Sequence, residues 1–167
     1  MSNLYVEKLR HDSKLPFKAT DHAACHDVFA NLSGPSTVKV FDVENRRHEQ
    51  NVFDQPVKLN PGDRALIPTG LKVCCDIGYC VKVYARSGLS VKNGLTLANC
   101  VGVIDADYRQ ELFVAVINQT IKPQVIDHND RIAQIMIEKL DDTVIIDGNL
   151  PPIDSNRNGG FGHTGTK

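Results

Sequence analysis

The 167-residue chain is predicted to fold as an all-β protein, a barrel or sandwich of many short strands. Val and Ile together number 29, against 23 Leu and Ala, and β-branched side chains favour the pleated surface of a sheet. Short runs rich in Val, Ile, Phe and Tyr recur between turn signals, and no long helical period interrupts them. The length suits a single domain, with its body over residues 1–150.

Turn signals mark where the runs end. Gly, Pro, Asn and Asp gather there because they suit the backbone conformations of tight turns. These places are Ser33-Gly34-Pro35, Asn60-Pro61-Gly62, Pro68-Thr69-Gly70, Ile77-Gly78, Asn93-Gly94 and His128-Asn129-Asp130. Alternation is clearest over residues 79–85, where Val81, Val83 and Ala85 share one face of the predicted strand and Lys82 and Tyr84 share the other.

At most one short helix is expected, near residues 87–92. Ser87 is of a type that caps a first helical turn, and Gly94 is of the type that ends a helix in a left-handed conformation. Such a helix has only one or two turns. It therefore does not change the all-β class.

Two segments differ in composition from the runs around them. Residues 42–56 are the most polar stretch and are predicted to be a solvated loop or a hairpin tip. Residues 151–167 hold two prolines, four glycines and almost no aliphatic side chain after Ile153. Such a tail cannot bury enough apolar surface to order itself, so a flexible C-terminal arm is expected.

Composition excludes several classes of protein. Nineteen Lys and Arg against 20 Asp and Glu leave no positive excess to hold a polynucleotide, so no nucleic-acid partner is expected. No apolar run approaches the roughly 20 residues that cross a bilayer, so no membrane partner is expected either. Five cysteines, an odd number, and a charged N-terminal stretch suit reduced thiols in a cytoplasmic protein.

Two polar clusters are candidates for chemistry. Arg86, Ser87 and Gly88 lie where a strand turns into the short helix, and this arrangement suits either a phosphate cradle or an ordinary capped turn. Asp105 follows a buried run, where a carboxylate costs free energy unless it is solvated or paired. It is either a general base within reach of a water molecule or, with Asp107, part of a solvated hairpin turn.

Three further clusters have competing interpretations. In the strand at 130–136, Arg131, Ala133 and Ile135 are expected on one face and Gln134 on the other, as a core amide or a ligand contact. The tail at 157–165 suits a flap that lays an aromatic ring on a flat ligand, or a disordered end. His22 and His26 are four residues apart and would converge on a metal only if that segment were helical, which its composition disfavours.

Taken together, five blocks resemble in order and spacing the homotrimeric dUTPase (dUTP diphosphatase) family. Those at 85–89, 102–109 and 159–165 are the most specific. The blocks are Ala24-Cys-His-Asp-Val28, Ala85-Arg-Ser-Gly-Leu89, Gly102-Val-Ile-Asp-Ala-Asp-Tyr-Arg109, Arg131-Ile-Ala-Gln134 and Gly159-Gly-Phe-Gly-His-Thr-Gly165. The resemblance implies a jelly-roll-like β-barrel and a homotrimer. Its sites would lie between subunits, each completed by a neighbour's C-terminal arm over 151–167.

The resemblance also implies the reaction, dUTP plus water to dUMP plus pyrophosphate with Mg²⁺. Asp105 would activate the water that attacks the α-phosphorus, and Asp27 would hold the hydrated Mg²⁺ through water. Tyr108 would pack under the deoxyribose, and Asn99 with the β-hairpin backbone would read the uracil edge. The implied nucleotide-binding residues are Arg86, Ser87, Gly88, Asn99, Gly102, Val103, Ile104, Tyr108, Phe113, Gln134, Arg157, Phe161, Gly162, His163 and Thr164.

The chain departs from the family pattern in three motifs. Cys25 and His26 stand where a glycine and an aromatic or aliphatic residue are usual, and Gln110 replaces a glycine. In the last motif Asn156 occupies the usual arginine position and Arg157 follows it. Either the loop is one residue shorter and Arg157 still reaches the γ-phosphate, which we favour, or that contact is lost.

Two other functions remain open. A dCTP deaminase shares the fold, but it needs a Glu at the base, and Tyr108 as a sugar platform disfavours it. A nucleotide-binding regulator would act through a protein partner, which the segment at 36–55 would contact. That segment is predicted to be an inserted loop or hairpin that binds a partner, strengthens the trimer or does neither.

Overall fold

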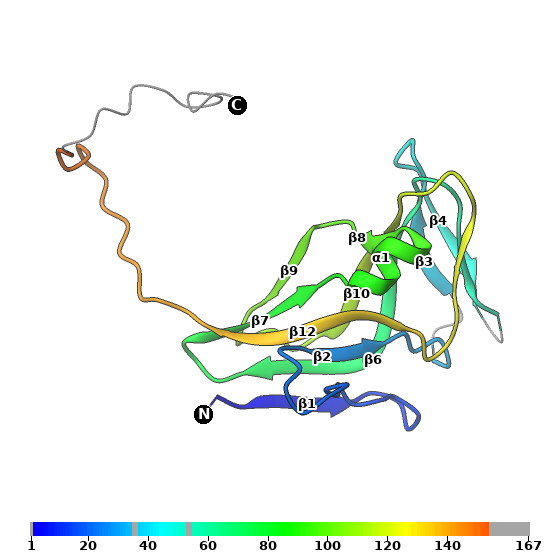
Figure 1. Ribbon diagram of the computed structural model, residues 1–167, viewed down its shortest axis with the longest axis horizontal. Helices are drawn as coiled ribbons and strands as arrows, with labels where there is room; N and C mark the ends of the chain where they lie inside the picture. The colour runs from blue at the N-terminus through cyan, green and yellow to red at the C-terminus, as the bar shows by residue number, and fades with distance from the viewer. Residues whose placement is uncertain (1, 35–36, 53–54, 154–167) are drawn as a thin grey trace.

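The computed structural model describes residues 2–34, 37–52 and 55–153, and these fold into strands with one short helix (Figure 1). The all-β, jelly-roll-like fold class is confirmed. The strands are β1 (Leu4–Lys8), β2 (His26–Phe29), β3 (Thr37–Phe41), β4 (Arg47–Asn51), β5 (Val57–Leu59), β6 (Arg64–Cys75), β7 (Tyr79–Tyr84), β8 (Leu95–Leu97), β9 (Val101–Ile104), β10 (Glu111–Asn118), β11 (Gln124–Ile126) and β12 (Arg131–Lys139). Arg157, Phe161, Gly162, His163 and Thr164 lie outside the described residues.

Two larger sheets enclose one core. The first has the order β4-β3-β6-β10-β8, with β1 also paired to β6, and the second has the order β2-β12-β7-β9. A short pair, β11 with β5, stands beside them. Both larger sheets contribute fully buried aliphatic side chains to the same cluster, among them Val40, Ile67, Leu112, Val28, Val81 and Ile135. Over 79–85, Val81 and Val83 are buried as predicted.

The predicted turn at Pro68-Thr69-Gly70 is wrong, because β6 continues through it. A register shift opposite Glu111 and Phe113 makes this stretch a bulge in the pairing with β10. The Thr69 hydroxyl donates to the Leu112 carbonyl (2.7 Å), and the Gly70 N–H donates to the Glu111 carboxylate (2.7 Å). Gly70 has φ +69°, and a Cβ there would lie 2.2 Å from Ser13 Oγ. Glycine is therefore required at this bulge.

The predicted helix is present as α1 (Ser87–Asn93), but its cap differs from the prediction. Arg86 is the N-cap residue, with no side-chain capping bond, and Ser87 is the first helical residue. Gly94 ends the helix as predicted, in the left-handed region at φ 62°, with its N–H donating to the Ser90 carbonyl (3.1 Å).

The strict alternation predicted for 130–136 fails at the start of β12. A register shift between Arg131 and Ala133, opposite β2, forms a second bulge. Ile132 and Ala133 are therefore both buried, although they are adjacent in sequence. Beyond the bulge the alternation holds, with Ile135 in the core and Gln134 half-buried on the other face.

The described part of the 36–55 segment forms an antiparallel hairpin. β3 pairs with β4 from Thr37 opposite Asn51 to Phe41 opposite Arg47, and β4 is an edge strand with mostly exposed polar side chains. Figure 1 shows this hairpin at one end of the molecule. Its role stays a prediction.

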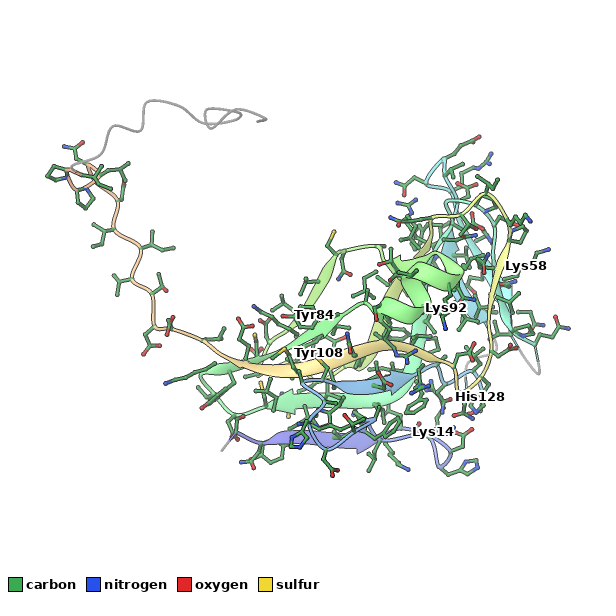
Figure 2. The ribbon with its side chains drawn as sticks, viewed as in Figure 1. Lys14, Lys58, Tyr84, Lys92, Tyr108 and His128 are labelled. Carbon is green, nitrogen blue, oxygen red and sulfur yellow. The ribbon has the colours of Figure 1, made fainter. Side chains whose placement is uncertain are left out.

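After β12 the chain leaves the body as an extended segment, drawn in orange in Figure 1. Figure 2 shows its side chains standing apart from the sheets. Val144, Ile145 and Ile146 are largely exposed there. Among the residues that the structure describes, no helix has the length and apolar character needed to cross a membrane.

Candidate active site

Four strands of the second sheet align the residues predicted to bind phosphates. Asp27 on β2 pairs with Gln134 on β12, Gln134 pairs with Tyr84 on β7, and Tyr84 pairs with Val101 on β9. Directly opposite residues of antiparallel strands share a face. The row therefore brings Asp27 and Gln134 together beside Tyr84, just before the turn at Arg86. Figure 2 labels Tyr84 on this sheet.

Asp27 is a buried carboxylate held by two arginines. Its side chain accepts one hydrogen bond on each oxygen, from Arg86 Nε to Oδ1 (3.0 Å) and from Arg131 Nη1 to Oδ2 (3.1 Å). Arg86 Nη1 also donates to the Arg131 carbonyl (2.9 Å). Only 8% of Asp27 is exposed, and burying a carboxylate is tolerable here because both oxygens are paired. The three side chains carry a net charge of +1.

Cys25 and His26, the neighbours of Asp27 in the first motif, bring no charge to the site at neutral pH. Burial is the main reason that the pKa of the Cys25 thiol is raised, and the negative charge of Asp27 adds to this effect. Burial also lowers the pKa of His26, with a smaller contribution from the positive charge of Lys18. Cys25 is therefore a thiol and His26 a neutral imidazole at pH 7, and Asp27 keeps its two arginines as its partners.

The other predicted phosphate contacts lie at the same turn. Ser87 and Gly88 begin α1 directly after Arg86, and a Cβ added at Gly88 would meet nothing within 4 Å. Gln134 is half-buried, and its Nε2 donates to the Ala85 carbonyl (3.0 Å), which ties β12 to the turn. The structure thus brings together Asp27, Arg86, Ser87, Gly88 and Gln134.

A small cavity of about 80 Å³ gathers the residues predicted to hold the base. It lies where the chain crosses from β8 in the first sheet to β9 in the second, through a turn in which Cys100 has φ 62°. Five predicted residues line this cavity: Asn99, Gly102, Val103, Ile104 and Phe113. β9 is an edge strand, so one side of its backbone is left unpaired by the sheet and can hydrogen-bond a ligand.

Gly102 has little room for a side chain in this cavity. An added Cβ would lie 3.0 Å from Val83 Cβ and 3.5 Å from Asn99 Nδ2. We expect Gly102→Ala to cost about 1–3 kcal/mol of overpacking. If the cavity holds the nucleotide that the family resemblance implies, a cost of this size in the bound state raises its KM by roughly 5- to 150-fold.

Steady-state kinetics on Gly102→Ala and on Gly148→Ala test this expectation. Gly148 is the matched control, because a Cβ there would meet nothing within 4 Å and its exposed segment lies outside the two sheets. An unchanged KM in Gly102→Ala would show that the cavity does not hold the substrate.

Tyr108 and Asp105 lie close together but do not line that cavity. The Tyr108 N–H donates to the Asp105 carbonyl (3.1 Å), closing a turn, and the Tyr108 hydroxyl donates to the Glu111 carbonyl (2.9 Å), which fixes the ring. Tyr108 lines a hollow against β1 and β6. Asp105 is exposed and lines another hollow of about 530 Å³ with Asp107 and Arg109. In the single chain both carboxylates are exposed at this turn, and the role of Asp105 as a general base stays a prediction.

Asp105 is far from the phosphate residues of its own chain. Ile104 pairs with Val81, so Asp105 lies opposite Cys80, six residues before Arg86 along β7. At about 3.3 Å per residue the two are roughly 20 Å apart along the strand. A base and a phosphate-binding group cannot act on one phosphorus over that distance, because a base must be within hydrogen-bond reach of its proton.

No group of three or more His, Cys, Asp or Glu in the described ranges is arranged to hold a metal ion directly. Asp27 fits a metal held through water, because each carboxylate oxygen has two lone pairs and uses one for an arginine. Mg²⁺ usually keeps several of its waters and binds few protein groups. The residues present therefore fit a Mg²⁺ ion that is held mainly by the phosphates of a bound nucleotide and only through water by Asp27.

Sequence reasoning missed two residues that the structure brings to the site. Arg131 was expected on the face opposite Gln134, yet it reaches Asp27, which pairs with Gln134. Glu111 accepts two hydrogen bonds from Arg10 and one from the Gly70 N–H, next to the Tyr108 anchor. An acidic residue at the start of a buried strand was the available signal for Glu111. Arg131 opens the fourth family-like block, but no role was predicted for it.

Comparisons with known proteins agree on one family. The dUTPase family profile matches residues 52–165. A deoxyuridine 5'-triphosphate nucleotidohydrolase of Fusobacterium nucleatum subsp. nucleatum is 34% identical over 168 aligned residues, covering 99% of each chain.

Two solved structures share the fold. A mutant of the Staphylococcus bacteriophage 80alpha dUTPase with dUpNHpp has a TM-score of 0.76 at 20% identity, over 98% of each chain. A mutant dUTPase from phage phi11 of S. aureus, which coordinates a structural Mg(II) ion, has a TM-score of 0.68 at 20% identity, over 92% of this chain and 99% of that one.

Proposed function

Because the chain belongs to the dUTPase family, we propose that it hydrolyses dUTP to dUMP and pyrophosphate. The observation that carries this proposal is the small cavity at the connection from β8 to β9. It joins Asn99, Gly102, Val103, Ile104 and Phe113 against an unpaired strand edge. A flat base with donors and acceptors along one edge suits such a cavity.

The base is selected by hydrogen bonds and by size. The Asn99 side chain offers a donor and an acceptor, and the backbone of Gly102 and Val103 offers more. The cavity is small, about 80 Å³, and its size would disfavour the extra methyl group of thymine. A cytosine amine would meet donors where uracil presents an acceptor. Phe113 closes the cavity from β10.

The phosphates are held at the turn before α1. The triphosphate carries about four negative charges, which cationic groups must offset. Arg86 has N–H groups that neither Asp27 nor the Arg131 carbonyl uses, and Ser87, Gly88 and Gln134 lie beside it. Mg²⁺, held by the phosphates and through water by Asp27, would draw electron density from the reacting phosphorus.

Asp105 acts as the general base. It accepts a proton from the water that attacks the α-phosphorus, and the pyrophosphate leaves with the electrons of the broken P–O bond. Tyr108 supports the deoxyribose, and its ring is fixed by the bond from its hydroxyl to Glu111. A ribose 2′-hydroxyl would meet this ring, which disfavours UTP.

The roughly 20 Å between Asp105 and Arg86 in one chain supports a site shared between subunits of a homotrimer. One subunit would supply the β8–β9 cavity with Asp105 and Tyr108, and another would supply Asp27, Arg86, Ser87, Gly88 and Gln134. We propose that the arm of 151–167 completes the site. Phe161 would cover the base, and Arg157, Gly162, His163 and Thr164 would close on the phosphates.

A nucleotide panel tests the proposed function. Purified protein with Mg²⁺ should release pyrophosphate from dUTP and scarcely from dTTP, dCTP or UTP, and EDTA should suppress the release. The absence of pyrophosphate from an intact trimer would refute the proposal. Release of ammonia from dCTP would instead identify a deaminase.

A further inference from the structure

Arg131 has no role in the function proposed above, although the structure ties it to that site. We propose that Arg131 is a positioning residue that holds Arg86 ready for the triphosphate by occupying one oxygen of Asp27. This inference rests on the proposed function, since it concerns the same phosphate-binding turn. The contacts of the three side chains, their burial and the bulge in β12 carry it.

The bulge gives Arg131 its direction. Regular alternation along β12 would place Arg131 on the face opposite Gln134 and away from Asp27. The register shift between Arg131 and Ala133 interrupts that alternation, and Arg131 Nη1 donates to Asp27 Oδ2 at 3.1 Å. Bulges are known to redirect a side chain next to a functional site.

Asp27 is a fixed point for both arginines. Its backbone is paired on one side with Gln134 of β12. On the other side the Asp27 N–H donates to the Phe17 carbonyl (2.8 Å) and the Phe17 N–H donates to the Asp27 carbonyl (3.3 Å). Its carboxylate is nearly buried. A guanidinium that binds Asp27 is therefore held in place relative to the second sheet and to the turn before α1.

The orientation of Arg86 depends on the fact that each oxygen of the Asp27 carboxylate binds a different arginine. Arg86 uses Nε on Oδ1 and one Nη1 hydrogen on the Arg131 carbonyl, so three of its five N–H groups remain. A free guanidinium next to a carboxylate tends to bind both oxygens side by side. Arg131 Nη1 lies against Oδ2 and the Arg131 carbonyl accepts from Arg86 Nη1, so Arg86 binds Oδ1 alone and retains N–H groups for phosphate.

The charges support the same role. Without Arg131 the remaining pair, Arg86 with Asp27, is neutral, whereas the observed trio carries +1. Arg131 is the more exposed of the two arginine side chains, at 45% against 23% for Arg86. Its loss therefore changes the charge and geometry of the turn more than it changes the packing of the core.

The test is a comparison of binding by ligands with different numbers of phosphates. Arg131→Gln should bind the imido analogue dUpNHpp, with Mg²⁺, about tenfold more weakly than the wild type, the scale of one charge-assisted hydrogen bond. Binding of dUMP should change by less than about twofold, because the proposed base and sugar contacts lie at the β8–β9 cavity and at Tyr108, away from Arg131. Arg131→Lys, which keeps a cation near Oδ2, should recover most of the loss.

A double-mutant cycle separates positioning from direct contact. If Arg131 acts through Asp27, Arg131→Gln should weaken dUpNHpp binding little further in an Asp27→Asn background. Arg47→Gln is the matched control, because Arg47 lies on the exposed edge strand β4 and pairs with Glu49. It should bind both ligands as the wild type does.

Three results would overturn the inference: equal losses for dUMP and dUpNHpp, no loss for either, or full additivity with Asp27→Asn. If the wild type binds dUpNHpp and hydrolyses dUTP, and Arg131→Gln does both equally well, the positioning role of Arg131 is refuted but the proposed function is not. A wild type that neither binds dUpNHpp nor hydrolyses dUTP would refute the proposed function together with this inference.

Discussion

Asp105→Asn is expected to abolish most turnover of dUTP while nucleotide binding is preserved. The amide has nearly the shape of the carboxylate but cannot accept the proton of the attacking water. Loss of a positioned general base lowers kcat by about 10²–10⁴-fold. Binding of dUpNHpp should stay within about twofold of the wild type, because the contacts to base and phosphates come from other residues.

Asp107→Asn is the matched control for this experiment. Asp107 lies two residues away in the same turn, is exposed and lines the same hollow as Asp105. We expect its kcat to remain close to the wild-type value in the same pyrophosphate assay. Retained turnover in Asp105→Asn, or an equal loss in both variants, would contradict the assignment of Asp105 as the base.

Glu111→Ala is expected to give the largest loss of stability among these variants. The Glu111 carboxylate accepts hydrogen bonds from Arg10 Nη1 (2.8 Å), Arg10 Nη2 (3.2 Å) and the Gly70 N–H (2.7 Å). The two side chains are only 14% and 18% exposed. Removing one partner of such a pair leaves a poorly solvated guanidinium and an unpaired N–H, at a cost of about 3 kcal/mol. For a chain of this length the Tm should fall by roughly 6–12 °C.

The matched control is Glu49→Ala on the edge strand β4. Glu49 also pairs with an arginine, Arg47, but both side chains are about half exposed, at 46% and 54%. Exposed pairs contribute little, so its Tm should match that of the wild type. Thermal unfolding is to be followed at one protein concentration, because assembly shifts Tm by mass action. Equal Tm values for the two variants would refute the importance of the Arg10–Glu111 pair.

Local patterns predicted much of the fold correctly. Alternation over 79–85, the β-branched composition and the stop signal at Gly94 led to β7, the all-β class and the end of α1. Pro68-Thr69-Gly70 has the composition of a turn but lies within β6. The reason is that Thr69 and Glu111, which is distant in sequence, satisfy the bulged backbone. A local pattern cannot register a partner on another strand.

The candidate site shows the same division. Single motifs, and their likeness to one family, predicted a base-binding set and a phosphate set, and the described residues of each set outside the C-terminal arm lie together, apart from Tyr108. The distance between Asp105 and Arg86 was not predictable from spacing, since it depends on the register of β7 with β9. That register separates residues that the reaction requires to meet.

By itself, the sequence determined the strand content, the short helix and the identity of most residues proposed to bind the nucleotide. The tertiary structure alone decided which of them are partners. Asp27 meets Arg86 from 59 positions away and Arg131 from 104 positions away. The second contact depends on a bulge that turns Arg131 out of its expected face. Strand register and bulges are set by packing across the whole sheet, and only the folded chain contains that information.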